Sequence, residues 1–141
     1  MHHFQSETEI RAIVNGFELC QTEKTAFKHQ DHLVVAVAYL QDSTVSAAIE
    51  RMRNSLMRFI KYHEVDQRKY NETITVFWFE VVADALAKMP ASLNLLERCN
   101  RVLQEFPNSA LVLDHYSSGL LFSDEARKGF VKPDLRDWKE R

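Results

Sequence analysis

Residues that bend or break a backbone are scarce in this sequence, which has three glycines and three prolines among its 141 residues. A β-sheet protein of this length needs turn residues at nearly every hairpin, whereas helices joined by short loops need few of them. The scarcity therefore predicts an all-α fold. With 45% hydrophobic and 27% charged residues, the composition is that of a globular protein and not of a disordered one.

Apolar residues recur at spacings of three and four positions in five segments, which is typical of amphipathic helices. The clearest stripe lies between Asn71 and Pro90, where the spacing holds without interruption. If Trp78 in this stripe is fully buried, its truncation to alanine should cost ~3–5 kcal/mol. The segment Leu33 to Leu40 is apolar at almost every position, which predicts a central helix covered on more than one side. The five main helices are expected at about residues 7–20, 29–41, 44–62, 72–89 and 93–106.

Side chains that cap helices precede these stripes. Ser6 and Glu9 have the spacing of a capping box, in which each side chain accepts from a backbone N–H of the other's turn. Ser43, Asn71 and Ser92 are the predicted N-caps of the third, fourth and fifth helices, because short polar side chains there satisfy the first free amides.

The last third of the chain predicts shorter elements. A short sixth helix is expected at about residues 107–115 and a seventh at 123–129, and the tail 131–141 is expected to be irregular with Trp138 packed back on the core. No internal repeat or linker divides the chain. We therefore expect one helical domain over residues 1–141, a bundle of five main helices with short C-terminal helices.

The charge balance excludes some partners. The formal net charge is −2 and the isoelectric point about 6.3, so the chain has no general attraction to nucleic acid or to anionic lipid. No apolar run approaches the ~20 residues that span a bilayer, and no secretory signal opens the chain. We expect neither a nucleic-acid nor a membrane partner.

Cys20 and Cys99 are the only cysteines. Both lie in apolar helical patterns, and their wide separation matches no metal or redox motif. This pattern predicts reduced cysteines in the core of a cytoplasmic protein.

The residues with the strongest chemical potential are His29 and His32, at the start of the predicted central helix. Side chains three positions apart share a helix face, with Cβ atoms ~5–6 Å apart, so the pair has the spacing to chelate one divalent metal ion. Two imidazoles need a further ligand, and Glu72 is the best candidate if the two helix starts lie side by side. His115 is another candidate ligand, as are Asp31, His63 and Asn71.

A structural interpretation stands beside this one. An H-x-x-H pair is a weak motif, and polar residues in a first helical turn often only satisfy backbone amides. Asn71 and Glu72 likewise have the pattern of an N-cap followed by a carboxylate at the positive end of the helix dipole. The catalytic interpretation makes Glu72 or His32 a general base.

Three stretches together resemble a family of small helical bacterial proteins that has no assigned activity. Residues 27–33 (FKHQDHL) resemble F/W-T-H-x-x-H-L, and residues 70–75 (YNETIT) resemble the end of G-Y-H-E-T-I-T. The run from His115 to Leu135 resembles a Y-Y-S…L-x-S…A-R…P-D-L ending. The similarity spans about residues 27–135.

The resemblance implies a shared site built from His29, His32 and the turn 70–75, which includes Tyr70 and Asn71. It also implies residues that close this site: Tyr116, Ser117, Arg127 and Asp134. The chain departs from the pattern at Asn71, where the family has histidine, and an amide is a poorer ligand for zinc or iron than imidazole. Three explanations stay open: this site has lost a metal, His115 replaces the missing ring, or the family site is not a metal site.

Two functional hypotheses follow. The first is a pocket for a small molecule or a metal ion, lined by His29, His32, Tyr70, Asn71 and Glu72; if the protein is an enzyme, metal-assisted or general acid–base chemistry is the natural class. The alternative is a non-enzymatic module that binds another protein or a second copy of itself, with structural histidines. The sequence supplies no reaction.

Overall fold

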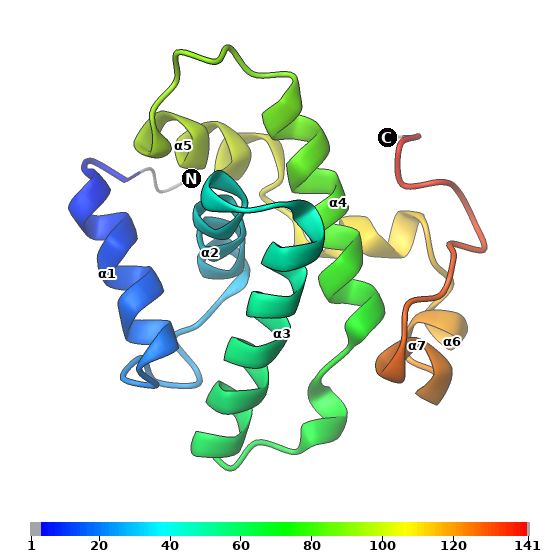
Figure 1. Cartoon of the computed structure of the whole chain (residues 1–141). Coiled ribbons are helices and arrows are strands. Elements are labelled where there is room, and N and C mark those ends of the chain that lie inside the picture. The colour runs from blue at the N-terminus through cyan, green and yellow to red at the C-terminus, as the bar shows by residue number, and fades with distance from the viewer. Residues whose placement is uncertain (1–3, 141) are drawn as a thin grey trace.

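The computed structural model describes residues 4–140 and is all-α, with no strand in that range (Figure 1). This confirms the predicted fold class. The long helices are α1 (Glu7–Glu18), α2 (His29–Asp42), α3 (Val45–Tyr62), α4 (Glu72–Ala87) and α5 (Leu95–Glu105). The short elements are two 3₁₀ segments, η1 (Gln67–Lys69) and η2 (Ser109–Asp114), and two short α-helices, α6 (Ser118–Leu121) and α7 (Asp124–Lys128).

Helix α2 lies at the centre of the fold. It packs against α1, α3, α4 and α5, and in Figure 1 it runs between α1 and α4 behind α3. Every residue from Leu33 to Tyr39 is buried, as the continuous apolar run predicts. A helix that is covered on all sides has no polar face, so α2 packs against other helices on every side.

The core has two parts on opposite flanks of α2. One lies among α2, α4, α5 and the C-terminal segment, with Val34, Phe77 and Leu103 among its buried members. The other lies among α1, α2 and α3, with Phe17 and Phe59 among its members. The opening between α3 and α4 falls where these two parts meet, and the candidate site is found there.

Two of the predicted caps are one or two residues off. Thr44, and not Ser43, caps α3, because the Thr44 side chain accepts from the backbone N–H of Ala47; Ser43 instead ends α2 and donates to the Tyr39 carbonyl. Asn94, and not Ser92, caps α5. The caps at Ser6 and Asn71 are confirmed.

Helix α4 is buried on more sides than its predicted stripe. Phe77 packs into the core with α2 and α5, while Phe79 packs against the α1–α3 side. Thr73 is fully buried and donates to the Ala126 carbonyl of α7 at 2.8 Å. Trp78 is only partly buried, because one side of its ring faces the opening. The condition for a truncation cost of ~3–5 kcal/mol at Trp78 is therefore not met.

The C-terminal third lies against α4. Helix α7 packs on α4 and on α6, and η2 also contacts α4. The segment after Gly129 is irregular, and Trp138 packs back onto the core, both as predicted. The sequence did not reveal η1 or α6, because a single helical turn is too short to show a periodic stripe.

Cys20 and Cys99 are both buried and free of disulfides. Burial raises the pKa of the Cys99 thiol to about 12, which keeps it protonated and unreactive. Over residues 4–140, every helix is too short or too polar to cross a membrane.

Candidate functional site

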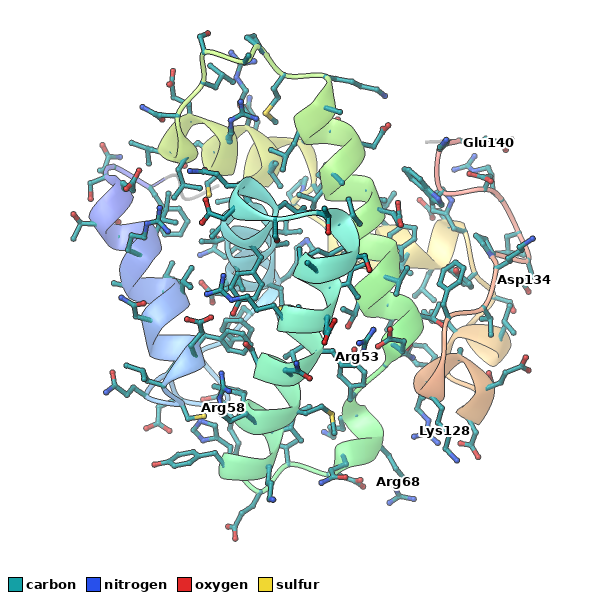
Figure 2. The ribbon with its side chains drawn as sticks, in the orientation of Figure 1. Arg53, Arg58, Arg68, Lys128, Asp134 and Glu140 are labelled. Carbon is teal, nitrogen blue, oxygen red and sulfur yellow. The ribbon has the colours of Figure 1, made fainter. Side chains whose placement is uncertain are left out.

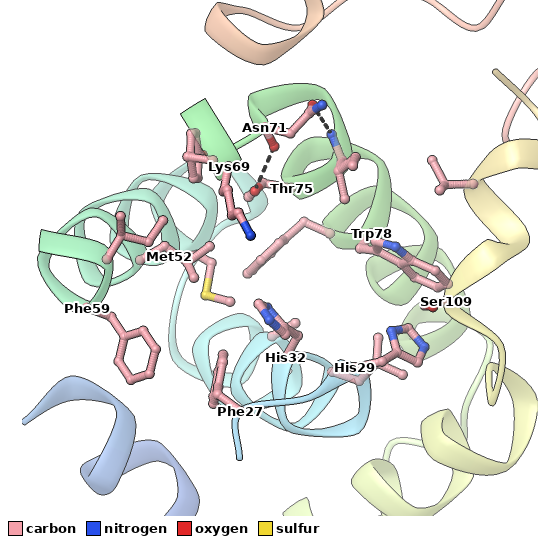
Figure 3. Close-up of a pocket in the computed structure, with 18 of the residues that line it drawn as sticks. Phe27, His29, His32, Met52, Phe59, Lys69, Asn71, Thr75, Trp78 and Ser109 are labelled. Atoms are coloured by element: carbon pink, nitrogen blue, oxygen red, sulfur yellow. Dashed lines mark hydrogen bonds between the residues drawn. The ribbon is translucent and has the colours of Figure 1, made fainter. Parts of the chain in front are cut away.

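A pocket of about 640 Å³ opens between the start of α2, the middle of α3 and the first half of α4 (Figure 3). Segment η2 and the residue pair Leu121 and Phe122 close its far side. The walls are mostly apolar, and the volume lies in the ordinary range for sites that take small organic molecules. Large apolar side chains among the lining residues are Phe27, Leu33, Met52, Leu56, Phe59, Ile74, Trp78, Phe79 and Phe122.

The two predicted helix starts do converge here. His29 and His32 from the first turn of α2 line the same pocket as Asn71, the N-cap of α4. Tyr70 lines it as well. Four of the predicted site residues are therefore neighbours in space, although about forty positions separate the two groups in the chain.

His32 projects into the middle of the pocket (Figure 3). Its ring packs on Phe27, with centroids 4.4 Å apart, and neither ring nitrogen has a hydrogen-bond partner among residues 4–140. Burial is the main cause that lowers the pKa of His32 to about 4, and the charge of the nearby His29 lowers it further. The neutral imidazole at pH 7 therefore offers one N–H donor and one lone pair to whatever enters the pocket.

His29 is already held by the protein. Its Nε2 donates to the Phe106 carbonyl at 2.9 Å, since a carbonyl oxygen only accepts. The ring also packs on Trp78, with centroids 4.8 Å apart. Burial lowers the pKa of His29 in spite of that hydrogen bond. In the neutral ring Nδ1 is left as an acceptor, so His29 and His32 present different chemistry to the pocket.

Glu72 does not join the histidines. Its carboxylate accepts two hydrogen bonds from Arg53, at 2.8 Å from Nε and 2.6 Å from Nη2, and a third from the Tyr70 hydroxyl at 2.6 Å. The Arg53 hydrogen bonds lower the pKa of Glu72. The expectation that Glu72 and the imidazoles share one hollow is therefore corrected: Glu72 is absent from the pocket lining, because α3 supplies an arginine that turns the carboxylate away.

The lowered pKa values argue against both predicted bases. A general base works best with a pKa near the operating pH, whereas the pKa of His32 is about 4 and that of Glu72 lies below its usual range. Tyr70, half-buried and donating to Glu72, has its pKa raised by desolvation and by that hydrogen bond. These groups bind protons too weakly or too strongly to exchange them readily at pH 7.

Glu72 faces a second, more open groove on the other side of Tyr70. This groove is lined by Arg53 of α3 and by Arg127 and Lys128 of α7, and Arg53 and Lys128 can be followed in Figure 2. Arg127 forms an ion pair with Asp124 and donates to the Arg68 carbonyl. The predicted site residue Arg127 is therefore placed with Glu72 and away from the histidine pocket.

The predicted site residues His115, Tyr116 and Ser117 lie outside the pocket lining. The His115 ring is fully buried, and its Nδ1 lies 3.0 Å from the carbonyls of Arg136 and Asp137. Tyr116 donates to the Val131 carbonyl at 2.6 Å, and Ser117 donates to Asp134 at 2.6 Å. These side chains hold the C-terminal segment in place, so we call the contacts of residues 115–117 with residues 131–137 the C-terminal clasp.

Asn71 lines the histidine pocket and also contacts the C-terminal third of the chain. Its Oδ1 accepts from the backbone N–H of Ile74, and its Nδ2 donates to the Leu121 carbonyl at 2.8 Å. Both ends of the amide are used inside the protein. An imidazole at this position would have to serve as cap and as donor with a different geometry.

No group of three or more His, Cys, Asp or Glu side chains gathers closely enough to hold a metal ion within residues 4–140. The predicted ligands are split three ways: His29 and His32 line the pocket, Glu72 pairs with Arg53, and His115 anchors the clasp. The donor set of a typical metal site needs three or four protein ligands. Within residues 4–140, the predicted ligands therefore do not form a common donor set.

Sequence reasoning missed Lys69, Lys24 and the aromatic wall. Lys69 is the last residue of the 3₁₀ turn η1, and in Figure 3 its amine points into the pocket toward His32. Lys24 lies in the loop between α1 and α2 and lines the same opening. A lysine in a loop looks like an ordinary solvated residue in the sequence, and only the chain path brings it to the pocket.

No family model, curated protein or solved structure matches this chain. The resemblance of its motifs to a family of small helical proteins therefore stays a prediction.

Proposed function

We propose that this protein binds one small organic molecule with a mostly apolar body in the pocket between α2, α3 and α4. The observation that supports the proposal most directly is His32. Its imidazole lies among apolar side chains, has no hydrogen-bond partner in the part of the chain that the structure describes, and points into the open volume (Figure 3).

The His32 side chain is half-buried, and its ring makes no hydrogen bond within residues 4–140, so its polar atoms stay available to a molecule in the pocket. A few convergent polar groups in an otherwise apolar concave surface are typical of ligand sites. His32 is therefore placed to bind and orient a ligand.

The apolar wall supplies the affinity. Phe27, Phe59, Trp78 and Phe79 present aromatic surface to the same volume. Burial of apolar surface contributes about 25 cal/mol per Å², so a flat two-ring molecule of ordinary size would gain several kcal/mol from contact with these side chains. We propose binding, since the lowered pKa values of His32 and Glu72 make both groups weak general bases at pH 7.

A cytoplasmic location is part of this proposal. Cys20 and Cys99 are buried free thiols, and free thiols are typical of proteins in a reducing compartment.

The test uses a neutral fluorescent probe, N-phenyl-1-naphthylamine, which brightens in apolar surroundings. We expect saturable binding to the native protein and at least a tenfold loss of affinity in Ala110→Trp, since Ala110 lines the pocket from η2 and a bulky ring there fills the opening. The matched control is Ala91→Trp, on an exposed loop outside the pocket, which should bind like the native protein. Absence of saturable binding, or equal affinity in all three proteins, would refute the proposal.

A further inference from the structure

The charged side chains that line the pocket are all of one sign. Within residues 4–140, Lys24 and Lys69 contribute to the lining, and no aspartate or glutamate does. The chain has 20 acidic residues against 18 lysines and arginines, so composition does not explain this exclusion. With both histidines neutral at pH 7, as their lowered pKa values require, the pocket has a positive rim above an apolar floor.

The position of Lys69 is set by the backbone on both sides. Its N–H donates to the Asp66 carbonyl at 2.9 Å, and the N–H of Tyr70 donates to the Gln67 carbonyl at 3.1 Å. Tyr70 is fixed in turn by its hydrogen bond to Glu72. A short 3₁₀ turn and an anchored tyrosine therefore aim Lys69 at the pocket.

Lys69 differs from the cations around it. Arg68 is paired with Asp66, and Arg53 with Glu72, whereas Lys69 has no ion pair with residues 4–140. Figure 3 shows its amine and the His32 ring pointing toward one another from opposite walls. The Lys69 ammonium therefore faces the neutral His32 imidazole across an apolar volume. A negatively charged group between them would pair with the ammonium and accept from the imidazole N–H.

We propose that the ligand is an organic carboxylate, whose head group binds between Lys69 Nζ and the N–H of His32 and whose apolar body lies against the aromatic wall. A carboxylate has two oxygens and accepts from both donors at once, and hydrogen bonds between ionised groups are about twice as strong as neutral ones. A cationic ligand would meet Lys24 and Lys69 as like charges. This inference rests on the proposed function, because it names the ligand class of that pocket.

The test compares 2-naphthoate with 2-naphthamide, which share shape and differ in charge, by titration calorimetry at pH 7.5 in low salt. We expect the carboxylate to bind about tenfold more tightly than the amide, equivalent to ~1.4 kcal/mol. Lys69→Met should bring the two affinities to within about twofold of each other while the amide affinity stays unchanged. Added salt should weaken naphthoate binding only.

Lys61→Met is the matched control, because Lys61 is an exposed lysine at the end of α3 outside the pocket lining; both affinities should stay as in the native protein. The inference is overturned if the amide binds as tightly as the carboxylate. It is also overturned if Lys69→Met weakens both compounds equally, or if a protein that binds N-phenyl-1-naphthylamine does not bind 2-naphthoate. Failure of the proposed function would be seen separately, because the native protein would then not bind the neutral probe N-phenyl-1-naphthylamine.

Discussion

At the scale of single residues, two kinds of polar side chain can be told apart. Asn71 and Thr73 are buried and fully used inside the protein, where each links α4 to a carbonyl of the C-terminal segment. His32 is different, because its half-buried ring packs on Phe27 and makes no hydrogen bond within residues 4–140. The first kind stabilises the fold, and the second is what a binding site needs.

The lowered pKa of His32 predicts a specific dependence of stability on pH. In the unfolded chain the ring takes up a proton near pH 6.5, and in the folded protein only near pH 4. Between these values the unfolded state binds more protons, so stability is fully present above pH 6.5 and falls as the pH drops toward 4. We expect His32 to account for a loss of ~2–3 kcal/mol between pH 7 and 4.5.

Urea unfolding of the native protein and of His32→Leu at both pH values measures this contribution. Other groups also titrate in the range, among them His29, whose pKa is also lowered, so the difference between the two proteins isolates His32. Equal losses of stability in the two proteins would contradict the prediction.

At the scale of elements, the helix starts show how far local chemistry decides a boundary. Two short polar residues precede α5, and Asn94 is the one that caps it: its Oδ1 accepts from the Glu97 N–H at 2.8 Å, and the Glu97 carboxylate accepts from the Asn94 N–H at 3.1 Å. This reciprocal capping box needs a glutamate three positions on. Ser92 is followed at that position by Leu95, which is buried in the core, so it has no such partner.

Removal of the true cap should destabilise the protein and removal of the apparent one should not. We expect Asn94→Ala to lower the free energy of unfolding by ~1 kcal/mol, because one of the first free amides of α5 loses its acceptor. Ser92→Ala, on the exposed loop, should change it by less than ~0.5 kcal/mol. Urea midpoints of the three proteins settle the order, and a larger effect at Ser92 would show that the helix begins earlier in solution.

At the scale of the whole molecule, the pocket depends on the C-terminal clasp. Leu121 and Phe122 line the pocket, and the Leu121 carbonyl is held by Asn71. The clasp fixes this wall from behind, because Tyr116 donates to the Val131 carbonyl and the His115 ring lies against the carbonyls of residues 136 and 137. Fold stability and ligand binding are therefore linked through residues 115–137.

Deletion of residues 131–141 tests this link. We expect a loss of ~3–5 kcal/mol in the free energy of unfolding, since the buried polar atoms of His115 and Tyr116 lose their partners at ~1–3 kcal/mol each and the packing of Trp138 is lost as well. The affinity for N-phenyl-1-naphthylamine should fall with it. Denaturant unfolding and probe titration give both values.

Deletion of residues 139–141 alone is the control, because it leaves every contact of the clasp in place. It should keep both the stability and the probe affinity of the full chain. If the longer deletion unfolds at the same denaturant concentration as the full chain, the clasp does not contribute to stability as described.

The sequence by itself determined the helical fold, the central position of α2 and most helix boundaries. Helix periodicity, capping and chain-breaking residues act over three or four positions, so the stripe after Asn71 and the apolar run at Leu33 could be read directly. The same local rules placed His29 and His32 on one helix face and Asn71 at the start of α4, whereas the packing of the helices brings these residues to one pocket.

Only the tertiary structure decided the partner of each polar side chain. Glu72 was expected beside the histidines, but the register of α3 against α4 brings Arg53 to it at 2.6 Å and turns it away. Lys69 reaches the pocket through the path of a short turn, and His115 is taken up by a tail more than twenty positions away. Charge pairs and hydrogen bonds act over a few ångströms in space, whereas sequence patterns report neighbours along the chain, so the composition of the pocket emerged only after the helices were packed.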